Sequence, residues 1–370
     1  MKPKAEILDA LRGFCALIVV VLHFSENYPS AVGGSWLLPH GCLPVEYFFV
    51  LTGFALTYAY DDRWGKMTLL GFFKRRILRL QPLVVVGSVI GAAIYLLASE
   101  QYARQVPGGE LGLGQLFLLT LWCCTMLPAP HSMGWVLLHP LQGPLWTMFY
   151  IYLANVLYAV VLRHLKTWML GVLALAAIGF TFFVGIRCGG FHAGPVWRWL
   201  AKDGSILWGG NCGALARMCF PLLVGMVIAR KGWKIRTGKA GLWICRALLA
   251  AIFFAPEFKP NRLANGLFES AAVVIGMPLV LLCGIGGRIE NVRLASICRF
   301  LGAYSFPLYA THYPLTMLER VWRDAHATAP WQLHLAVCCA LALFAFINAW
   351  AAMKAVEWFN ARLPRLGVRN

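Results

Sequence analysis

The chain of 370 residues is 60% hydrophobic and only 13% charged, with a mean hydropathy of +0.67. Soluble domains are closer to half apolar and a quarter charged, so the composition excludes an ordinary soluble protein. Its apolar runs are about 20 residues long, which is what a helix needs to cross roughly 30 Å of hydrocarbon. Lys and Arg outnumber Asp and Glu by 33 to 15. Because this excess lies in short loops, it indicates the positive-inside pattern of membrane proteins rather than nucleic-acid binding.

Ten apolar runs are predicted to cross the membrane. In chain order they cover residues 7–24, 45–60, 77–98, 144–162, 168–186, 206–229, 242–258, 267–285, 301–318 and 333–353. The loops at 61–79, 163–166 and 230–239 carry clusters of Lys and Arg, so we expect them to be cytoplasmic. The alternation then places both termini in the cytoplasm. We expect a single all-α, polytopic membrane domain over residues 1–370.

One further apolar run, Leu111–Leu127, does not fit this alternation. Both of its flanks must be external if the basic loops at 61–79 and 163–166 are both to be cytoplasmic. We therefore expect a re-entrant or surface-lying segment. The neighbouring segment 128–144 is rich in Pro, Gly, His and Trp and is expected to form an external cap. The 12 cysteines lie mostly inside apolar runs and show no metal-ligand spacing, so no metal site is predicted.

Two ionisable residues lie in the first predicted span, where charge is costly and usually functional. Arg12 is expected near the cytoplasmic end and His23 in or just below the outer half. They would face the same side, about 16 Å apart along the helix axis. A neutral imidazole there can act as general base toward a hydroxyl, or it can simply hydrogen-bond a neighbouring helix. Asp9 precedes Arg12 by one turn and is expected to form a salt bridge with it.

A second cluster, Arg75, Arg76 and Arg79, lies at the cytoplasmic mouth of the third predicted span. Arg76 and Arg79 are one turn apart, so their guanidinium groups share a face and form a fork suited to phosphate. A positive-inside anchor is the alternative, and it fully explains Arg75, which stays a candidate cofactor-binding residue beside them. A donor held by its phosphates here would extend its reactive end half a membrane toward His23. Coenzyme A has this shape.

Several motifs occur in order along nearly the whole chain: LDALRG followed by VVVLHF, then VEYFFVLTGF, FFKRRILRLQP, GPLWTMFYIYLANVLY, FPLLVGMVIAR, FLGAYSFPLYATHYPL and VEWF. Together they resemble the acyltransferase-3 family of integral membrane acyltransferases, which typically O-acetylate bacterial polysaccharides and glycans. The resemblance implies about ten helices and a catalytic base at His23, with Arg12 positioning or tuning it. It also implies that Arg76 and Arg79 contact the nucleotide phosphates of acyl-CoA.

Four more residues are candidates. Glu46 occupies a slot where the family has an acidic residue, and it would either pair with His23 and raise its basicity or face water at the interface. Tyr309 and His312 lie in the motif SFPLYATHYPL, where His312 would line the acceptor site or make a structural hydrogen bond. Trp146 is expected on the outer side, where its ring can stack on a sugar. Trp146, His312 and Tyr309 are therefore the candidate substrate-binding residues.

One departure from the family pattern concerns position 151. The family usually has a glutamate five positions after the tryptophan, whereas this chain has Ile151. An acidic group that would orient an acceptor sugar or the histidine is therefore missing. A further acid, Glu269, lies in the predicted span 267–285 without an assigned role.

The sequence thus predicts an O-acetyltransferase-like enzyme of the bacterial inner membrane. It would move an acyl group, with acetyl-CoA as the favoured donor, from cytoplasmic acyl-CoA to a hydroxyl of an extracytoplasmic carbohydrate or glycan. The alternative is a proton-coupled transporter or exporter of a small envelope metabolite, with His23 as proton relay. The lack of a repeat between the two halves argues against a transporter. No metal and no nucleic-acid partner is expected.

Overall fold

The computed structural model describes residues 6–26, 37–103, 110–129, 138–191, 212–258 and 261–362. Within these ranges the chain is helical, apart from loops and one isolated bridge between Gly238 and Gly287. Seven helices there are long and apolar enough to cross a membrane, which is compatible with a polytopic membrane protein. The expected all-α class is therefore what the structure has.

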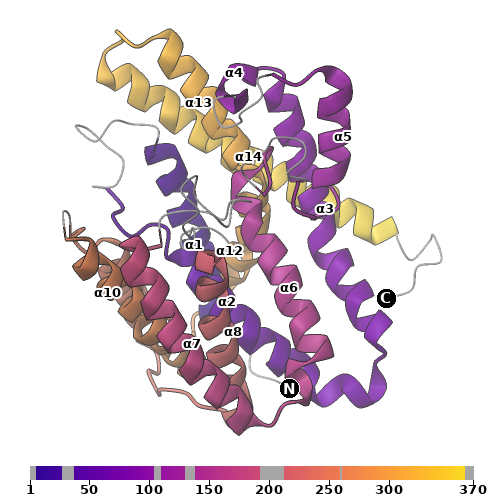
Figure 1. Cartoon of the computed structure of the whole chain (residues 1–370), viewed down its shortest axis with the longest axis vertical. Helices are drawn as coiled ribbons and strands as arrows, with labels where there is room; N and C mark the ends of the chain where they lie inside the picture. Colours follow the sequence, from indigo (N-terminus) through magenta and orange to yellow (C-terminus); the bar gives the residue numbers. More distant parts are fainter. Residues whose placement is uncertain are drawn as a thin grey trace.

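The helices lie side by side in a bundle (Figure 1). In chain order they are α1 (Glu6–Ser25), α2 (Pro44–Tyr60), α3 (Leu69–Tyr95), α4 (Ser99–Ala103), α5 (Leu113–Cys123), α6 (Trp146–Val160), α7 (Thr167–Cys188), α8 (Gly213–Lys231), α9 (Gly241–Phe253), α10 (Arg262–Ala271), α11 (Met277–Gly286), α12 (Val292–Thr311), α13 (Tyr313–Ala325) and α14 (Trp331–Arg362). A π-helical turn, Ala272–Gly276, joins α10 to α11. Short 3-10 turns cover Asp61–Lys66, Gly143–Leu145 and Leu162–His164.

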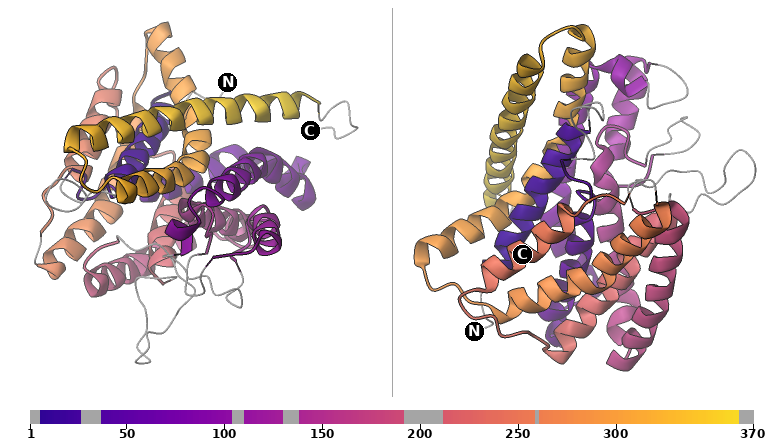
Figure 2. Two further views of the ribbon diagram at one scale, coloured as in Figure 1. Left: turned by 90° about the horizontal axis from the view of Figure 1, so that it is seen from above. Right: turned by 90° about the vertical axis from the view of Figure 1, so that its left-hand side faces the viewer.

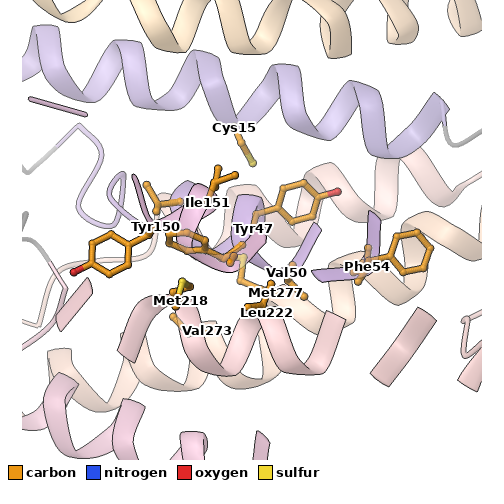
Figure 3. Close-up of a cluster of buried hydrophobic side chains, with 14 of the residues drawn as sticks. Cys15, Tyr47, Val50, Phe54, Tyr150, Ile151, Met218, Leu222, Val273 and Met277 are labelled. Atoms are coloured by element: carbon orange, nitrogen blue, oxygen red, sulfur yellow. The ribbon is translucent and has the colours of Figure 1, made fainter. Parts of the chain in front are cut away.

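The centre of the bundle is built on two close helix pairs, α2 with α8 and α1 with α12. Glycine permits the close approach in the first pair, because a Cβ on Gly53 would overlap the carbonyl of Leu222. Small residues bring helix backbones together in the same way in many membrane bundles. Figure 3 shows Cys15, Tyr47 and Ile151 among the apolar side chains that fill the space between the central helices. Cys15 is thus a buried apolar filler, as expected.

The outer surface of the bundle is strongly apolar. Large hydrophobic side chains stand exposed on it, among them Leu175 on α7, Trp243 on α9 and Leu343 on α14. α13 and α14 form a hairpin along one side (Figure 2), and of the 32 residues of α14 only Ala345, Ala349, Ala352 and Met353 are buried. Surfaces of this kind are rare in soluble monomers and suit contact with lipid.

The basic loops lie together at the end of the molecule where α1 begins (Figure 1). Arg230 donates to the Asp61 carboxylate at 2.8 Å and to the carbonyl of Arg163 at 3.0 Å. Nearby, the Arg288 amide donates to the carbonyl of Gly238 at 2.9 Å. The loops that the charge pattern assigns to one side of the membrane therefore share one end of the fold. That this end is cytoplasmic stays a prediction.

The ten predicted spans do not correspond to ten long helices. α9 has 13 residues, and the predicted span 301–318 is divided at His312 between α12 and α13. α5, within the segment Leu111–Leu127, has 11 residues and is about 16 Å long, roughly half the hydrocarbon thickness. It is thus too short to cross by itself. The start of the predicted span 206–229 and much of the expected cap at 128–144 lie outside the described residues.

Candidate functional site

Three residues of helix α12, at successive heights along its axis, mark the positions of the candidate site residues in the bundle. Ser305 lies 3.4 Å from an Arg12 guanidinium nitrogen, Tyr309 is one turn further along, and His312, which caps the helix, stacks on His23 with ring centroids 5.4 Å apart. At 1.5 Å per residue the first and last levels are about 10 Å apart. Arg12 and His23 therefore both face α12, as the spacing of eleven residues on α1 predicts.

A cavity of about 210 Å³ lies at the level of His23. Its polar and aromatic lining consists chiefly of His23, Glu26, Trp146, Arg217, Tyr309 and Tyr313. Glu26 directly follows α1, and the others come from α1, α6, α8, α12 and α13, so distant segments of the chain build the cavity together. We call this cavity the histidine pocket.

His23 is held from three sides. Its Nδ1 lies 3.1 Å from a carboxylate oxygen of Glu26, three residues later, and its ring packs on His312 and against the edge of Tyr313, 5.3 Å between centroids. The carboxylate favours a proton on Nδ1 and so leaves Nε2 as the basic nitrogen. A base with an adjacent orienting carboxylate is the arrangement that activates a hydroxyl for nucleophilic attack.

The predicted partnership of Glu46 with His23 is wrong. Glu46 is fully buried, and both of its carboxylate oxygens accept hydrogen bonds from Arg217 of α8. It does not face water either, so neither sequence-based alternative describes it. The physical reason is burial, since an ionised carboxylate in this environment needs a charged partner. The carboxylate beside His23 is Glu26 instead.

Arg217 has no counterpart among the sequence-based candidates. Its guanidinium carbon lies 5.1 Å from the centre of the Trp146 ring, within cation–π range. It also donates to the carbonyls of Cys42 at 2.8 Å and Phe191 at 2.9 Å. The signal that could have found it is a single arginine inside the apolar run of residues 213–229, well before the basic pair Arg230 and Lys231.

A second cavity, of about 150 Å³, lies at the Arg12 level and is called the arginine pocket. Three arginines line it, namely Arg12, Arg76 and Arg79, and no Asp or Glu is among its lining residues. The predicted fork of Arg76 and Arg79 thus faces a common space. Arg75 does not line it but is exposed, 3.8 Å from the sulfur of Met67, which fits the anchor alternative.

Arg12 is fixed at the edge of this pocket by α1 and α12. It forms the predicted salt bridge with Asp9 at 3.2 Å and donates to the carbonyl of Gly302 at 3.0 Å. A third cavity of about 290 Å³ shares Arg12 with the arginine pocket and extends to Glu6 and Arg288 at the end of the basic loops. A series of cavities therefore leads from that end through the arginine pocket toward His23.

Position 151 lies on the arginine side of the path. Ile151 is buried and lines the arginine pocket, not the histidine pocket. The expectation that an acid here would orient the acceptor or the histidine is therefore wrong for this fold. Because isoleucine stands there, the three arginines face no carboxylate from α6.

The remaining candidates divide between lining and structural roles. Trp146 and Tyr309 line the histidine pocket. His312 lines neither pocket, and its Nδ1 lies 3.0 Å from the carbonyl oxygens of Leu308 and Tyr309. His312 thus makes the structural hydrogen bond, and it reaches the site only by stacking on His23. Glu269 is fully buried and lies 2.8 Å from Nδ1 of His40.

The fold and the site define a class of membrane protein in which an arginine-lined pocket and a base with its carboxylate lie along one path through an apolar bundle. The comparison with known families identifies the chain more closely. The acyltransferase-3 family model, described as an acyltransferase domain, matches residues 6–353, and the chain belongs to this family. It is an acyltransferase, which decides against the alternative of a transporter.

Three relatives illustrate the similarity. The chain is 31% identical over 163 residues to protein 2 of the picA locus of Rhizobium radiobacter. This match covers 41% of this chain and 80% of that protein. It is 21% identical over 367 residues to YrhL of Bacillus subtilis, named as a peptidoglycan O-acetyltransferase, covering 90% of this chain but 52% of YrhL. It is 25% identical over 328 residues to the acyltransferase MdmB of Streptomyces mycarofaciens, and the match covers 83% of this chain and 77% of MdmB. No solved structure matches the chain.

Proposed function

We propose that the protein transfers an acyl group, favouring acetyl, from cytoplasmic acyl-CoA to a hydroxyl of an extracytoplasmic carbohydrate or glycan, in the inner membrane of a bacterium. The observation that carries the proposal is the series of cavities leading from the basic end of the fold to the His23–Glu26 pair. One end suits a polyanion and the other suits activation of a hydroxyl, so donor and acceptor would arrive from opposite sides.

The arginine pocket suits the phosphates of coenzyme A. Arg76 and Arg79 share a face of α3, and Arg12 faces them from α1 without a carboxylate in the lining. Charge-assisted hydrogen bonds from guanidinium to phosphate are strong and geometrically specific. Arg12 and His23 are eleven residues apart on α1, so their backbones are about 16 Å apart along the helix axis, and their side chains meet α12 at levels about 10 Å apart. The extended pantetheine arm of coenzyme A can bridge such a span.

His23 would act as general base at the far end. Its Nε2 takes the proton of the acceptor hydroxyl, and the hydroxyl oxygen attacks the thioester carbonyl carbon. The tetrahedral intermediate collapses as the carbon–sulfur bond breaks, and the imidazolium returns its proton to the departing CoA sulfur. The products are an ester and free CoA. Glu26, at 3.1 Å, would hold the ring and stabilise the imidazolium.

The histidine pocket offers a wall for a sugar. Trp146 and Tyr313 line it with aromatic surface, and Glu26 can accept hydrogen bonds from hydroxyl groups. YrhL is named as a peptidoglycan O-acetyltransferase, which points to a peptidoglycan hydroxyl as acceptor in that relative. An acceptor of the same chemical class is therefore the first to test for this chain.

The test is acyl transfer by the full-length protein in lipid nanodiscs. Peptidoglycan fragments and acetyl-CoA are supplied together, and release of free CoA and esterified sugar are both measured. We expect both products, and we expect envelope glycans to lose O-acetyl esters when the protein is removed from its host. Intact acetyl-CoA together with unchanged envelope glycans would contradict the proposal.

A further inference from the structure

Tyr309 separates the two pockets. It lines both the histidine pocket and the arginine pocket, and no other residue of the two linings does so. Its side chain is 3% exposed. On α12 it stands one turn beyond Ser305, the level of Arg12, and three residues before His312, the level of His23. Its ring is thus the partition that any group passing from one pocket to the other has to meet.

The partition is held in place from α6 and α2. The Tyr309 hydroxyl lies 2.8 Å from the Thr147 hydroxyl and donates to the carbonyl of Pro144 at 3.0 Å. The ring of Phe48 stands edge-on to it at 5.8 Å between centroids. Displacing the tyrosine would break two buried hydrogen bonds and an aromatic contact, so the space beside it is well defined.

The arginine pocket is divided by polarity along its length. Arg12 lies at the Ser305 level, whereas Tyr309 and the Phe48 ring beside it supply aromatic surface at the partition. A donor held by phosphates at the arginines would therefore present its acyl end to this surface. Room for the acyl carbons is limited by the side chains that make the partition.

We propose that Tyr309, backed by Phe48, sets the length of the acyl group and restricts the donor to short acyl chains of two or three carbons. This inference rests on the proposed function. The acceptor oxygen is held at His23 in the histidine pocket, and the thioester reaches it past the Tyr309 ring, so the acyl carbons lie against this ring during transfer. A longer acyl chain then either has to displace the Tyr309 ring or cannot be accommodated beside it. A tight apolar pocket typically discriminates one methylene by about 10- to 200-fold.

The experiment compares donors on the full-length protein in nanodiscs. The kcat/KM values for acetyl-, propionyl-, butyryl- and hexanoyl-CoA are measured by CoA release with peptidoglycan fragments. We expect the wild type to prefer acetyl-CoA over butyryl-CoA by at least about tenfold. In Tyr309→Ala and in Phe48→Ala the butyryl-to-acetyl ratio should rise by about tenfold or more, because each change enlarges the same space.

Tyr304→Ala is the matched control. Tyr304 lies on the same helix, but its ring stacks on Phe346 of α14 at 6.3 Å and its hydroxyl donates to the Phe346 carbonyl. It lines neither pocket. The substitution therefore loosens α12 without widening the partition, and the donor ratio should stay at the wild-type value.

The outcomes separate the size filter, by which we mean the limit that Tyr309 and Phe48 set on acyl length, from the proposed function. An unchanged donor ratio in Tyr309→Ala and Phe48→Ala, or an equal shift in Tyr304→Ala, overturns the filter. If Tyr309→Ala does not fold, Phe48→Ala decides alone. If the wild type releases CoA from no donor, the proposed function fails, and equilibrium affinities for acetyl-CoA and butyryl-CoA decide the filter. Equal affinities in wild type and variants would then overturn it.

Discussion

His23 obtains its carboxylate from the residue that directly follows its own helix. Glu26 directly follows the last residue of α1, three residues after His23, and this spacing brings the two side chains within 3.1 Å. Glu46 also carries a carboxylate and lies close to the same pocket, but Arg217 engages both of its oxygens. The two glutamates therefore have separate tasks: Glu26 orients a base, and Glu46 neutralises a buried arginine.

Substitution of His23 and Glu26 should therefore reduce activity with little change in stability. We expect His23→Ala to lower kcat by about 10²- to 10⁴-fold, the usual contribution of a general base. Glu26→Gln keeps the shape but loses the charge beside Nδ1, so its loss should be smaller than that of His23→Ala. The measurement is acetyl transfer at saturating donor, with the thermal unfolding midpoint as control. Wild-type rates in His23→Ala would exclude it as the base.

The Glu46–Arg217 pair should show the opposite behaviour. Glu46→Gln leaves a buried guanidinium without its counter-charge, which typically costs about 3–5 kcal/mol of stability. Thermal unfolding in detergent measures the loss. The control is Glu290→Gln, which removes the partner of Lys239 in a solvent-exposed pair and should leave the midpoint unchanged. Equal midpoints for Glu46→Gln and Glu290→Gln would contradict the role of the buried pair.

At the scale of elements, α3 carries its arginines on two different faces. Arg76 and Arg79 line the arginine pocket, while Arg75 is exposed beside Met67. Helical periodicity places Arg79 beside both Arg76 and Arg75, three and four residues earlier, so the division between Arg76 and Arg75 comes from how α3 packs against its neighbours. α6 contributes Ile151 to the same pocket, so an apolar side chain stands where an acid would weaken anion binding.

Charge reversal on α3 should therefore depend on the face. Arg76→Glu or Arg79→Glu should raise the KM for acetyl-CoA by about 10- to 100-fold, since a hydrogen bond to a charged group is worth roughly 1.5–3 kcal/mol. Arg75→Glu is the matched control, with the same change of charge one residue away, and should have little effect. Direct binding of CoA by calorimetry gives the same comparison without turnover. Equal losses in all three variants would indicate a general surface effect.

Ile151→Glu provides an independent test of the same pocket. The new carboxylate would stand among Arg12, Arg76 and Arg79 and compete with phosphate, so donor affinity should fall. Ile151→Gln has nearly the same shape without the charge and should bind donor more tightly than Ile151→Glu. CoA affinity at low and moderate salt is the measurement. Unchanged affinity in Ile151→Glu would show that position 151 is remote from the donor phosphates.

Sequence reasoning succeeded for Asp9 and Arg12 on α1, missed Glu26 although it follows His23 by the same three-residue spacing, and failed for contacts between helices. The Asp9–Arg12 salt bridge and the shared face of Arg12 and His23 follow from spacing along α1. The partner of Glu46 lies 171 positions away on α8, and no spacing rule reaches that far. The pocket that Ile151 lines depends likewise on which helices pack around α6. Apolar run length predicts helices, but the division between α12 and α13 at His312 is set by packing.

At the scale of the whole molecule, the path has two chemically different ends. The basic loops meet around Arg230, Asp61 and Arg163, and the third cavity ends close to the same side at Arg288. The 27 residues of α3 carry the chain about 40 Å from there, enough to cross a bilayer. Glu110, bonded to Ser99 just after α3, lies at the far end.

This arrangement gives a testable orientation. A cysteine at Lys234 should react with a membrane-impermeant maleimide only in inverted vesicles, because basic loops are retained in the cytoplasm. A cysteine at Glu110 should react only in intact spheroplasts. The native chain, whose 12 cysteines include several buried ones, provides the labelling blank. Labelling of Lys234→Cys from outside would reverse the membrane orientation, and a cytoplasmic donor could then no longer enter at the arginine end.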